Sequence, residues 1–418
     1  MESSFGMHLE LLFRRHTTLW RVHQLRGKKG SISRTKNRRS IVYDLIIIGG
    51  GMSGISIGHF FEQQDILLLE KRDLLSGASG NNAGFLITGF GEHFHRTAQR
   101  WGKERAVEIQ QIHLSAHRRI RELTNHVEEC GSFSIGITEK ETTELKESFE
   151  LMSSCGLRVE WVENANLGLR SNKPALYNPK DGMLDSRKFW EELARRLPCR
   201  SGVTVMDVIE DEGSLKVVTN ENEFQTKRVI YCLNAYSSDL LPELRGRIIP
   251  LRAQMLEIEI FDPPPCMAPV MAEYGEIYWN FETNTLRFGG LEYMIPDEEV
   301  GIATSLSAGV LDAQLQWIRR NFALSHARNP LRSWFGTMGF TVDGFPVVGQ
   351  LPGRKNQYVL AGMCGLGHSY ALECASWIYE QIVNHRNEIP SYFSSDRILN
   401  LPRYSGGDWR TLYEAWNH

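Results

Sequence analysis

Long hydrophobic runs and cysteine motifs are both scarce in this sequence of 418 residues. No apolar stretch reaches the roughly 18 residues that a helix needs to span a bilayer, so no transmembrane segment is predicted. The seven cysteines are odd in number and none of them forms a C-x-x-C pair. Neither a disulfide framework nor a metal site is therefore indicated, and a reducing compartment fits best. The length favours two domains.

An excess of basic residues is also lacking, except at the N-terminus. Residues 1–40 carry ten basic and two acidic residues, a net of +8, whereas residues 41–418 carry 37 basic and 48 acidic residues, a net of −11. The acidic part offers no nucleic-acid surface, so no nucleic-acid partner is expected. Residues 1–40 have three open interpretations: a disordered basic tail, which we favour, a mitochondrial targeting sequence, or translation from an upstream start codon. The first goes with a cytoplasmic protein and the second with a mitochondrial one.

What the sequence does contain is a glycine-rich stretch, residues 43–84, around which the chain is organised. An apolar run at residues 45–48 suits a strand that is buried on both faces. Three glycines then follow as G-x-G-x-x-G, namely Gly49, Gly51 and Gly54. Such glycines serve a tight turn, close approach of backbone to a pyrophosphate, and close packing of helix on strand. A helix over residues 52–63 would aim its N-terminal N–H groups at the phosphates.

A second apolar run ends in Glu70, which follows Gly54 by 16 positions. This is close to the ~20-residue spacing of an acid that binds a ribose. Its charge would repel a ribose 2′-phosphate, so NADP is disfavoured even with Lys71 and Arg72 adjacent. Strand, glycines, helix, strand and acid occur in order, which predicts dinucleotide binding. The alternative is a glycine-rich turn in an unrelated α/β protein.

These motifs, followed by Gly-Ala-Ser-Gly-Asn-Asn-Ala-Gly at residues 77–84, resemble the start of the D-amino-acid oxidase superfamily of FAD-dependent amine oxidoreductases. The resemblance implies FAD rather than NAD. Non-covalent binding is favoured, because Cys364 does not match the attachment position of sarcosine oxidase. A second family signature at residues 334–349 precedes a strand, a glycine turn at residues 362–367 and a helix. That helix would direct its N-terminus at the pyrimidine edge of the flavin.

The resemblance implies an α/β fold, with a Rossmann-like FAD-binding domain and a discontinuous α+β substrate domain built on an antiparallel sheet. The expected boundaries are residues 41–95, 183–250 and 335–418 for the FAD-binding domain, and residues 96–182 and 251–334 for the substrate domain. Within the latter, the apolar spacing predicts one long helix over residues 103–130.

The resemblance also assigns candidate site residues. The candidate FAD contacts are Gly49, Gly51, Met52, Ser53, Gly54, Glu70, Lys71, Ser79, Gly80, Asn81, Asn82, Val205, Asn234, Ala235, Gly339, Asp343, Gly365, Leu366, Gly367 and His368. Val205 would present its backbone to the adenine, or is an ordinary core valine. Asn234 and Ala235 would lie near the phosphates or the ribityl chain.

The candidate residues at the reaction centre are Tyr278, Trp279, Met338 and His368. The two aromatic side chains would line the substrate pocket through apolar and cation–π contact, or would simply pack a sheet. His368 would donate a hydrogen bond to the flavin edge, or would cap the helix.

One departure from the family bears on the substrate. Amino-acid members carry an arginine that pairs with the substrate carboxylate bidentately, and its position is Met338 here. This favours an amine that is distant from any carboxylate. A carboxylate read by a different arginine stays open, although neither Arg252 nor Arg287 fits the motif.

We therefore predict FAD-dependent oxidation of a C–N bond in a small amine or amino acid, by hydride transfer to flavin N5 followed by imine hydrolysis. The electron acceptor, oxygen or another molecule, and the oligomeric state are not specified. Two alternatives stay open. One is modification of a tRNA wobble-uridine side chain, although such chains usually carry a methyltransferase domain that is absent here. The other is a non-catalytic FAD-binding module.

Overall fold

The computed structural model describes residues 42–90, 92–211 and 213–411. The interpretations given for residues 1–40 lie outside the described residues. None of the helices in the described part combines the length and the apolar character needed to cross a membrane.

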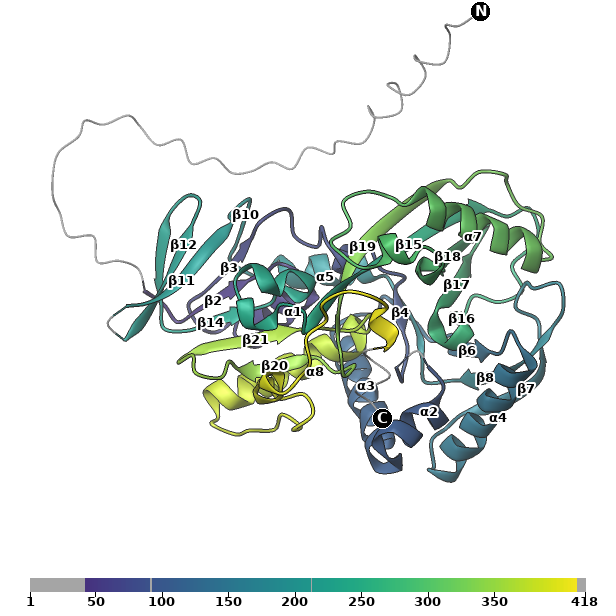
Figure 1. Cartoon of the computed structure of the whole chain (residues 1–418), viewed down its shortest axis with the longest axis horizontal. Helices are drawn as coiled ribbons and strands as arrows, with labels where there is room; N and C mark the ends of the chain where they lie inside the picture. The colour runs from purple at the N-terminus through teal and green to yellow at the C-terminus, as the bar shows by residue number, and fades with distance from the viewer. Residues whose placement is uncertain (1–41, 91, 212, 412–418) are drawn as a thin grey trace, which may run out of the picture. The chain divides into compact units, whose positions relative to one another are not determined.

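A six-stranded sheet carries the glycine-rich motif (Figure 1). In order across the sheet its strands are β10 (Cys199–Ser201), β3 (Ile66–Glu70), β2 (Leu45–Ile48), β14 (Val229–Tyr231), β21 (Gln357–Ala361) and β20 (Val347–Gln350). Neighbouring strands are parallel, except that β21 and β20 are antiparallel. Parallel strands need cover on both faces, and β2 is accordingly buried along its whole length.

The two faces of this sheet are covered by different structures, because successive side chains of a strand point in opposite directions. Leu45 and Ile47 contact a layer of helices, whereas Ile46 and Ile48 contact a second sheet and nearby loops. The helices are α1 (Met52–Phe60), α3 (Lys103–Leu123), α5 (Ser186–Ala194) and α8 (Gly367–Val383). The second sheet has the order β1 (Val42–Tyr43), β13 (Glu223–Thr226), β12 (Ser214–Thr219) and β11 (Val205–Asp211).

An eight-stranded sheet forms the other large part of the described chain (Figure 1). Its order is β19 (Arg332–Thr341), β15 (Ile248–Glu259), β18 (Thr285–Gly290), β17 (Ile277–Glu282), β16 (Val270–Ala272), β6 (Ser132–Ile135), β8 (Lys173–Asn178) and β7 (Glu160–Ala165). Only β16 and β6 pair in parallel. Helix α7 (Ala308–Asn321) covers one face, where its Ile318 joins a core with Phe281 and Phe288.

The remaining elements are short, apart from two helices that pack on each other, α2 (Phe94–Trp101) and α4 (Glu139–Ser154). A small sheet has the order β4 (Phe85–Leu86), β9 (Gly182–Leu184) and β5 (Val127–Glu128). The short helices are η1 (Ala78–Gly80), η2 (Asn234–Asp239), η3 (Pro242–Leu244), η4 (Glu273–Gly275), η5 (Glu292–Met294), α6 (Pro296–Glu299) and η6 (Ser395–Leu399).

The mixed α/β fold that the sequence predicts is confirmed, but the predicted helix over residues 103–130 is wrong at its end. Helix α3 stops at Leu123, because Thr124 adopts an extended conformation. The chain then forms β5, which pairs with β9. Strand pairing with a distant segment therefore overrides the local helical pattern.

The predicted domain boundaries fall inside two long strands. Strands β15 and β19 pair continuously, from Ile248 opposite Thr341 to Glu257 opposite Arg332. Both strands therefore run past the expected boundaries at residues 250 and 335. The division into two domains stays a prediction.

Candidate active site

A cavity of about 1120 Å³ opens at the carboxyl ends of the parallel strands β2, β3, β14 and β21. Ligands of open α/β sheets bind at this edge. The segments that follow these four strands all contribute to the cavity wall, and β15, β17 and β19 of the eight-stranded sheet close its other side. Both glycine turns, at Gly51 and at Gly365, therefore face one cavity.

The cavity wall at the start of α1 leaves little room for side chains. A Cβ atom on Gly51 would lie 2.8 Å from Ser79 Oγ, and one on Gly54 would lie 1.9 Å from the carbonyl oxygen of Gly49. The backbone N–H of Met52 donates to Ser79 Oγ at 3.0 Å. A polar oxygen thus already occupies the helix N-terminus, where N–H groups and the helix dipole favour an anion.

Two backbone N–H groups hold the Glu70 carboxylate at the end of β3. Its Oε2 accepts a hydrogen bond from the Gly50 N–H at 2.7 Å, and its Oε1 accepts one from the Arg72 N–H at 2.8 Å. Both contacts fix the carboxylate in the cavity wall, which Gly51 also lines. This position suits an acid that receives the hydroxyl groups of a ribose.

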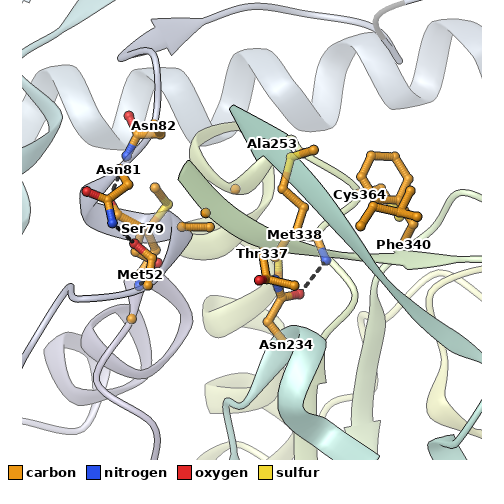
Figure 2. A pocket seen from close by; sticks show the side chains of 18 of the residues that line it. Met52, Ser79, Asn81, Asn82, Asn234, Ala253, Thr337, Met338, Phe340 and Cys364 are labelled. Carbon is orange, nitrogen blue, oxygen red and sulfur yellow. Dashed lines mark hydrogen bonds between the residues drawn. The ribbon is translucent and has the colours of Figure 1, made fainter. Parts of the chain in front are cut away.

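Asn81 and Asn82 line the cavity, but their amide groups brace the loop that carries them. The Asn81 side chain donates to the carbonyl oxygens of Ser76 and Gly77, both at 3.2 Å. The Asn82 side chain donates to the Ser79 carbonyl oxygen, and its own oxygen accepts from the Gly84 N–H at 2.8 Å. These contacts give the loop a fixed shape beside Met52 and Ser79, as Figure 2 shows.

Asn234, which follows β14, holds the second glycine turn in place through its side chain. Its side-chain oxygen accepts from the N–H groups of Gly362 at 2.9 Å and of Met363 at 3.1 Å. Gly365 has a φ of 80°, which favours glycine. A Cβ atom on Gly365 would lie 3.5 Å from the sulfur of Met338, so this turn and β19 leave only a narrow space. Asn234 and Met338 both line the cavity, and Figure 2 labels both of them.

His368 uses both ring nitrogens within the protein. Its Nδ1 lies 3.0 Å from the carbonyl oxygen of Phe85, and its Nε2 lies 2.9 Å from Ser186 Oγ. A carbonyl only accepts, so Nδ1 carries the proton and Nε2 accepts from the Ser186 hydroxyl. Burial lowers the pKa of His368 to about 4, so the ring is neutral at neutral pH. This arrangement leaves His368 no N–H for a flavin, and the expectation that it donates to the ring is not supported.

Two other expected site residues lie away from the cavity. Trp279 points to the opposite face of β17 from Tyr278, and its ring packs 5.8 Å from Trp317 and 5.5 Å from Phe322 in the core. Asp343 is buried and accepts hydrogen bonds from the Arg397 guanidinium at 2.7 and 3.1 Å. Both roles are structural. The interpretation of Trp279 as sheet packing therefore fits, and only Tyr278 of this pair lines the cavity.

The remaining candidates divide into those that line the cavity and those that support its wall. The lining candidates are Gly49, Gly51, Met52, Ser53, Glu70, Lys71, Ser79, Asn81, Asn82, Val205, Asn234, Tyr278, Met338, Gly365, Leu366, Gly367 and His368. The candidates outside the lining, besides Trp279 and Asp343, are Gly54, Gly80, Ala235 and Gly339. Gly339 supports the wall, because a Cβ atom there would lie 2.8 Å from Asn234 Oδ1.

Neither arginine considered for a substrate carboxylate replaces the one missing at Met338. Arg252 lines the cavity, but its guanidinium donates to the carbonyl oxygens of Glu298 at 3.0 Å and of Ser305 at 2.6 Å. Arg287 lies outside the lining and pairs with Glu257 at 3.2 Å.

The cavity also contains charged residues that no sequence motif identifies. Glu276, Glu292, Glu299 and Arg410 all line it. Arg410 binds Glu299 through both terminal nitrogens, at 2.8 and 2.6 Å, and contacts Glu276 at 3.3 Å. Burial raises the pKa of Glu292 to about 8, and the charges of Glu276 and Glu299 add to this. Arg410 is distant from the acids in sequence, so only the fold brings them together.

Comparison with known proteins identifies the family. The model of the FAD dependent oxidoreductase family, the D-amino-acid oxidase family, matches residues 44–381. The chain belongs to this family. It is therefore an FAD-dependent oxidoreductase, and the predictions of family and cofactor are confirmed.

Relatives of known sequence and structure agree with this. An N-methyl-L-tryptophan oxidase of Escherichia coli O127:H6 is 23% identical over 368 residues, which cover 79% of this chain and 92% of that protein. The glycine oxidase of Geobacillus kaustophilus has a TM-score of 0.68 at 19% identity, and the match covers 87% of this chain and 99% of that one. The L-proline dehydrogenase of P. horikoshii has a TM-score of 0.68 at 18% identity, covering 86% and 98%. These two structures share the fold.

The cavity fits FAD. Gly51 lines the cavity with backbone alone, and a Cβ atom there would lie 2.8 Å from Ser79 Oγ. Such close approach of backbone is what a diphosphate requires. Glu70 lines the same cavity, as expected of a ribose-binding acid, and the turn at Gly365 also brings backbone to its wall. The individual FAD contacts, and non-covalent attachment, stay predictions.

Proposed function

We propose that this protein uses FAD to oxidise the C–N bond of a small amine or amino acid. The observation that carries the proposal is the single cavity that joins the dinucleotide cradle at Gly51, the turn at Gly365 and a separate wall built from the eight-stranded sheet. The two solved relatives named above are called an oxidase and a dehydrogenase, so they do not single out an electron acceptor.

FAD, when bound, supplies the acceptor for the hydride on the carbon beside the nitrogen, and the resulting imine hydrolyses in water. The protein positions the reactants and sets the electrostatics. Helix α8 begins at Gly367 and directs the positive end of its dipole at the cavity, where it stabilises negative charge. His368, which is neutral, braces this helix start and adds no charge.

The wall opposite α8 is apolar near the glycine turn. Tyr278 packs edge-on against Phe85, with ring centroids 6.0 Å apart, and Met271 and Met338 line the same cavity. Such a wall excludes water and holds a carbon chain in place. A tRNA substrate is disfavoured, since residues 41–418 carry a net charge of −11 and would repel phosphates.

The test is a spectrum of the purified protein, recorded without oxygen before and after addition of amines and amino acids. We expect a bound flavin whose absorbance near its long-wavelength maximum is lost on addition of a substrate. Retained flavin absorbance across a broad set of amines would instead favour a non-catalytic FAD-binding module. Free FAD with the same amines is the control for reduction outside the protein.

A further inference from the structure

Glu292 is a buried acid in the cavity wall that has no cationic partner in the part of the chain that the structure describes. Its exposed fraction is only 8%, and it lines the cavity at the start of η5, directly after β18. Its Oε1 accepts a hydrogen bond from the Gln254 N–H at 2.5 Å. Within residues 42–90, 92–211 and 213–411, no nitrogen of lysine, arginine or histidine lies within 4.0 Å of this carboxylate.

The other acids in this part of the wall are paired. Glu92 forms an ion pair with Arg100. Glu276 and Glu299 share Arg410, whose Nη1 and Nη2 bind Glu299 and whose Nε and Nη2 contact Glu276. Because these two acids use the Arg410 guanidinium, it does not neutralise Glu292. Within the described residues, Glu292 is therefore an acid of this wall without a cation, and burial favours its protonated form until a positive ligand binds.

A network of buried amides holds the Glu292 carboxylate in place. The Gln314 side chain donates to the carbonyl oxygens of Gln254 at 2.8 Å and of Gly290 at 3.0 Å. The Gln254 side chain in turn exchanges two hydrogen bonds with the backbone of Ser307, at 3.0 and 2.7 Å. The Gln254 backbone is thus fixed on three sides, and its N–H presents a constant anchor to Glu292.

A carboxylate in this position favours a cation from solution. Burying a charge without a partner is costly, so the group either takes up a proton or binds a positive ligand. The groups that face it are Glu276 and Glu299, which repel its charge, together with Tyr278, whose own pKa the Glu292 charge helps to raise. An organic ammonium ion would satisfy the carboxylate.

That ammonium group differs from the amine that is oxidised. An amine loses a hydride from its α-carbon as the free base, because the nitrogen lone pair becomes part of the imine double bond. An ion pair with Glu292 would hold a nitrogen in its protonated form. A substrate that reaches Glu292 and is also oxidised therefore carries two nitrogens.

We propose that Glu292 binds the second, unreacting ammonium group of an aliphatic diamine, and that this class of compound is the substrate. The inference rests on the proposed amine oxidation. Gln254, whose N–H anchors Glu292, lies between Ala253 and Met255 on β15, and both of these line the cavity. With Met338 and Tyr278 they offer an apolar path for the methylene chain. The methionine at 338 provides no cation for a carboxylate.

The experiment compares three ligand series of matched chain length with the FAD-loaded protein: diamines, monoamines and ω-amino acids. Anaerobic titrations give the dissociation constant from the change in flavin absorbance, and the rate of flavin reduction is recorded separately. We expect the diamine to bind best and the ω-amino acid worst. Glu292→Gln should weaken diamine binding by about tenfold to a hundredfold, because a hydrogen bond to a charged group is lost. Monoamine binding should stay within about twofold.

Glu257→Gln is the matched control. Glu257 lies on the same strand as Gln254, pairs with Arg287 and Arg332, and does not line the cavity. This variant should keep the preference for diamines. Flavin content and the far-ultraviolet circular dichroism spectrum establish that both variants fold.

Two results would overturn the inference: equal binding of diamine and monoamine by the native protein, or equal weakening of both by Glu292→Gln. If monoamines or amino acids reduce the flavin in that case, amine oxidation stands and only the role of Glu292 fails. If diamines perturb the flavin spectrum through Glu292 but no amine reduces it, the binding site stands and amine oxidation fails.

Discussion

Replacing Gly51 by valine should abolish FAD binding while leaving the fold intact. Gly51 has φ −87° and ψ −173°, a conformation that any residue adopts. The neighbour that an added Cβ atom would meet is the Ser79 side chain, at 2.8 Å from its hydroxyl oxygen, and a side chain can rotate away. Two further methyl groups would then project over the N-terminus of α1, where the diphosphate is expected.

The magnitude follows from the donors that valine would cover. A hydrogen bond to a charged group contributes roughly 1.5–3 kcal/mol. Losing two N–H donors at the start of α1 would therefore cost roughly 3–6 kcal/mol of binding free energy, or about a hundredfold to ten-thousandfold in affinity. The assay is FAD titration of the apoprotein by flavin fluorescence, with thermal unfolding of the same sample recorded alongside.

Gly54→Val provides the contrast. A Cβ atom on Gly54 would lie 1.9 Å from the Gly49 carbonyl oxygen, which belongs to the backbone and cannot rotate away. This variant should fail to fold, whereas Gly51→Val should fold without cofactor. A folded Gly51→Val protein with native affinity for FAD would refute the assignment of the diphosphate to this turn.

Three further predictions concern the other side of the cavity and the core. Met338→Arg should raise flavin reduction by small amino acids relative to amines, and unchanged relative rates would mean that position 338 does not face the substrate carboxylate. Glu292 has its pKa raised from 4.5 to about 8, so its contribution to stability is present below pH 4.5 and is lost as the pH rises to 8. Urea unfolding at several pH values should therefore show that the free energy of unfolding declines between pH 4.5 and 8. Glu292→Gln should make this decline shallower by up to roughly 1.4 kcal/mol per pH unit, and parallel curves for the two proteins would contradict the raised pKa. Trp279→Ala should lower the free energy of unfolding by about 3–5 kcal/mol, because the ring is fully buried, and a change below about 1 kcal/mol would contradict its place in the core.

The fold and the cofactor could be predicted because their signals are local. A buried strand, the G-x-G-x-x-G turn, a helix, a second strand and Glu70 occur within one short segment, and each has its own physical requirement. The same holds for the second glycine turn, where Gly365 needs a positive φ. Such requirements act between near neighbours in the chain, so they are visible without knowledge of the tertiary structure.

Features that depend on distant segments could not be predicted from nearby sequence. The helical pattern of residues 103–130 continues past Leu123, but Val127 and Glu128 pair with β9 and end the helix early. For His368, the sequence gives a polar side chain at a helix start, whereas its hydrogen-bond partners come from Phe85 and Ser186. In both cases the partner lies far along the chain, and no pattern near the residue reveals it.

The ion pairs of the cavity also depend on distant segments, and they bear on the choice of substrate. Met338 alone suggests a substrate without a carboxylate, but a single missing arginine could be replaced by another from anywhere in the chain. The fold answers this for two arginines of the cavity wall, because Arg410 binds Glu276 and Glu299, and Arg252 binds backbone carbonyls. Glu292 is a buried acid of this wall that no cation within the described residues pairs with, and the distal ammonium group of a diamine would satisfy it.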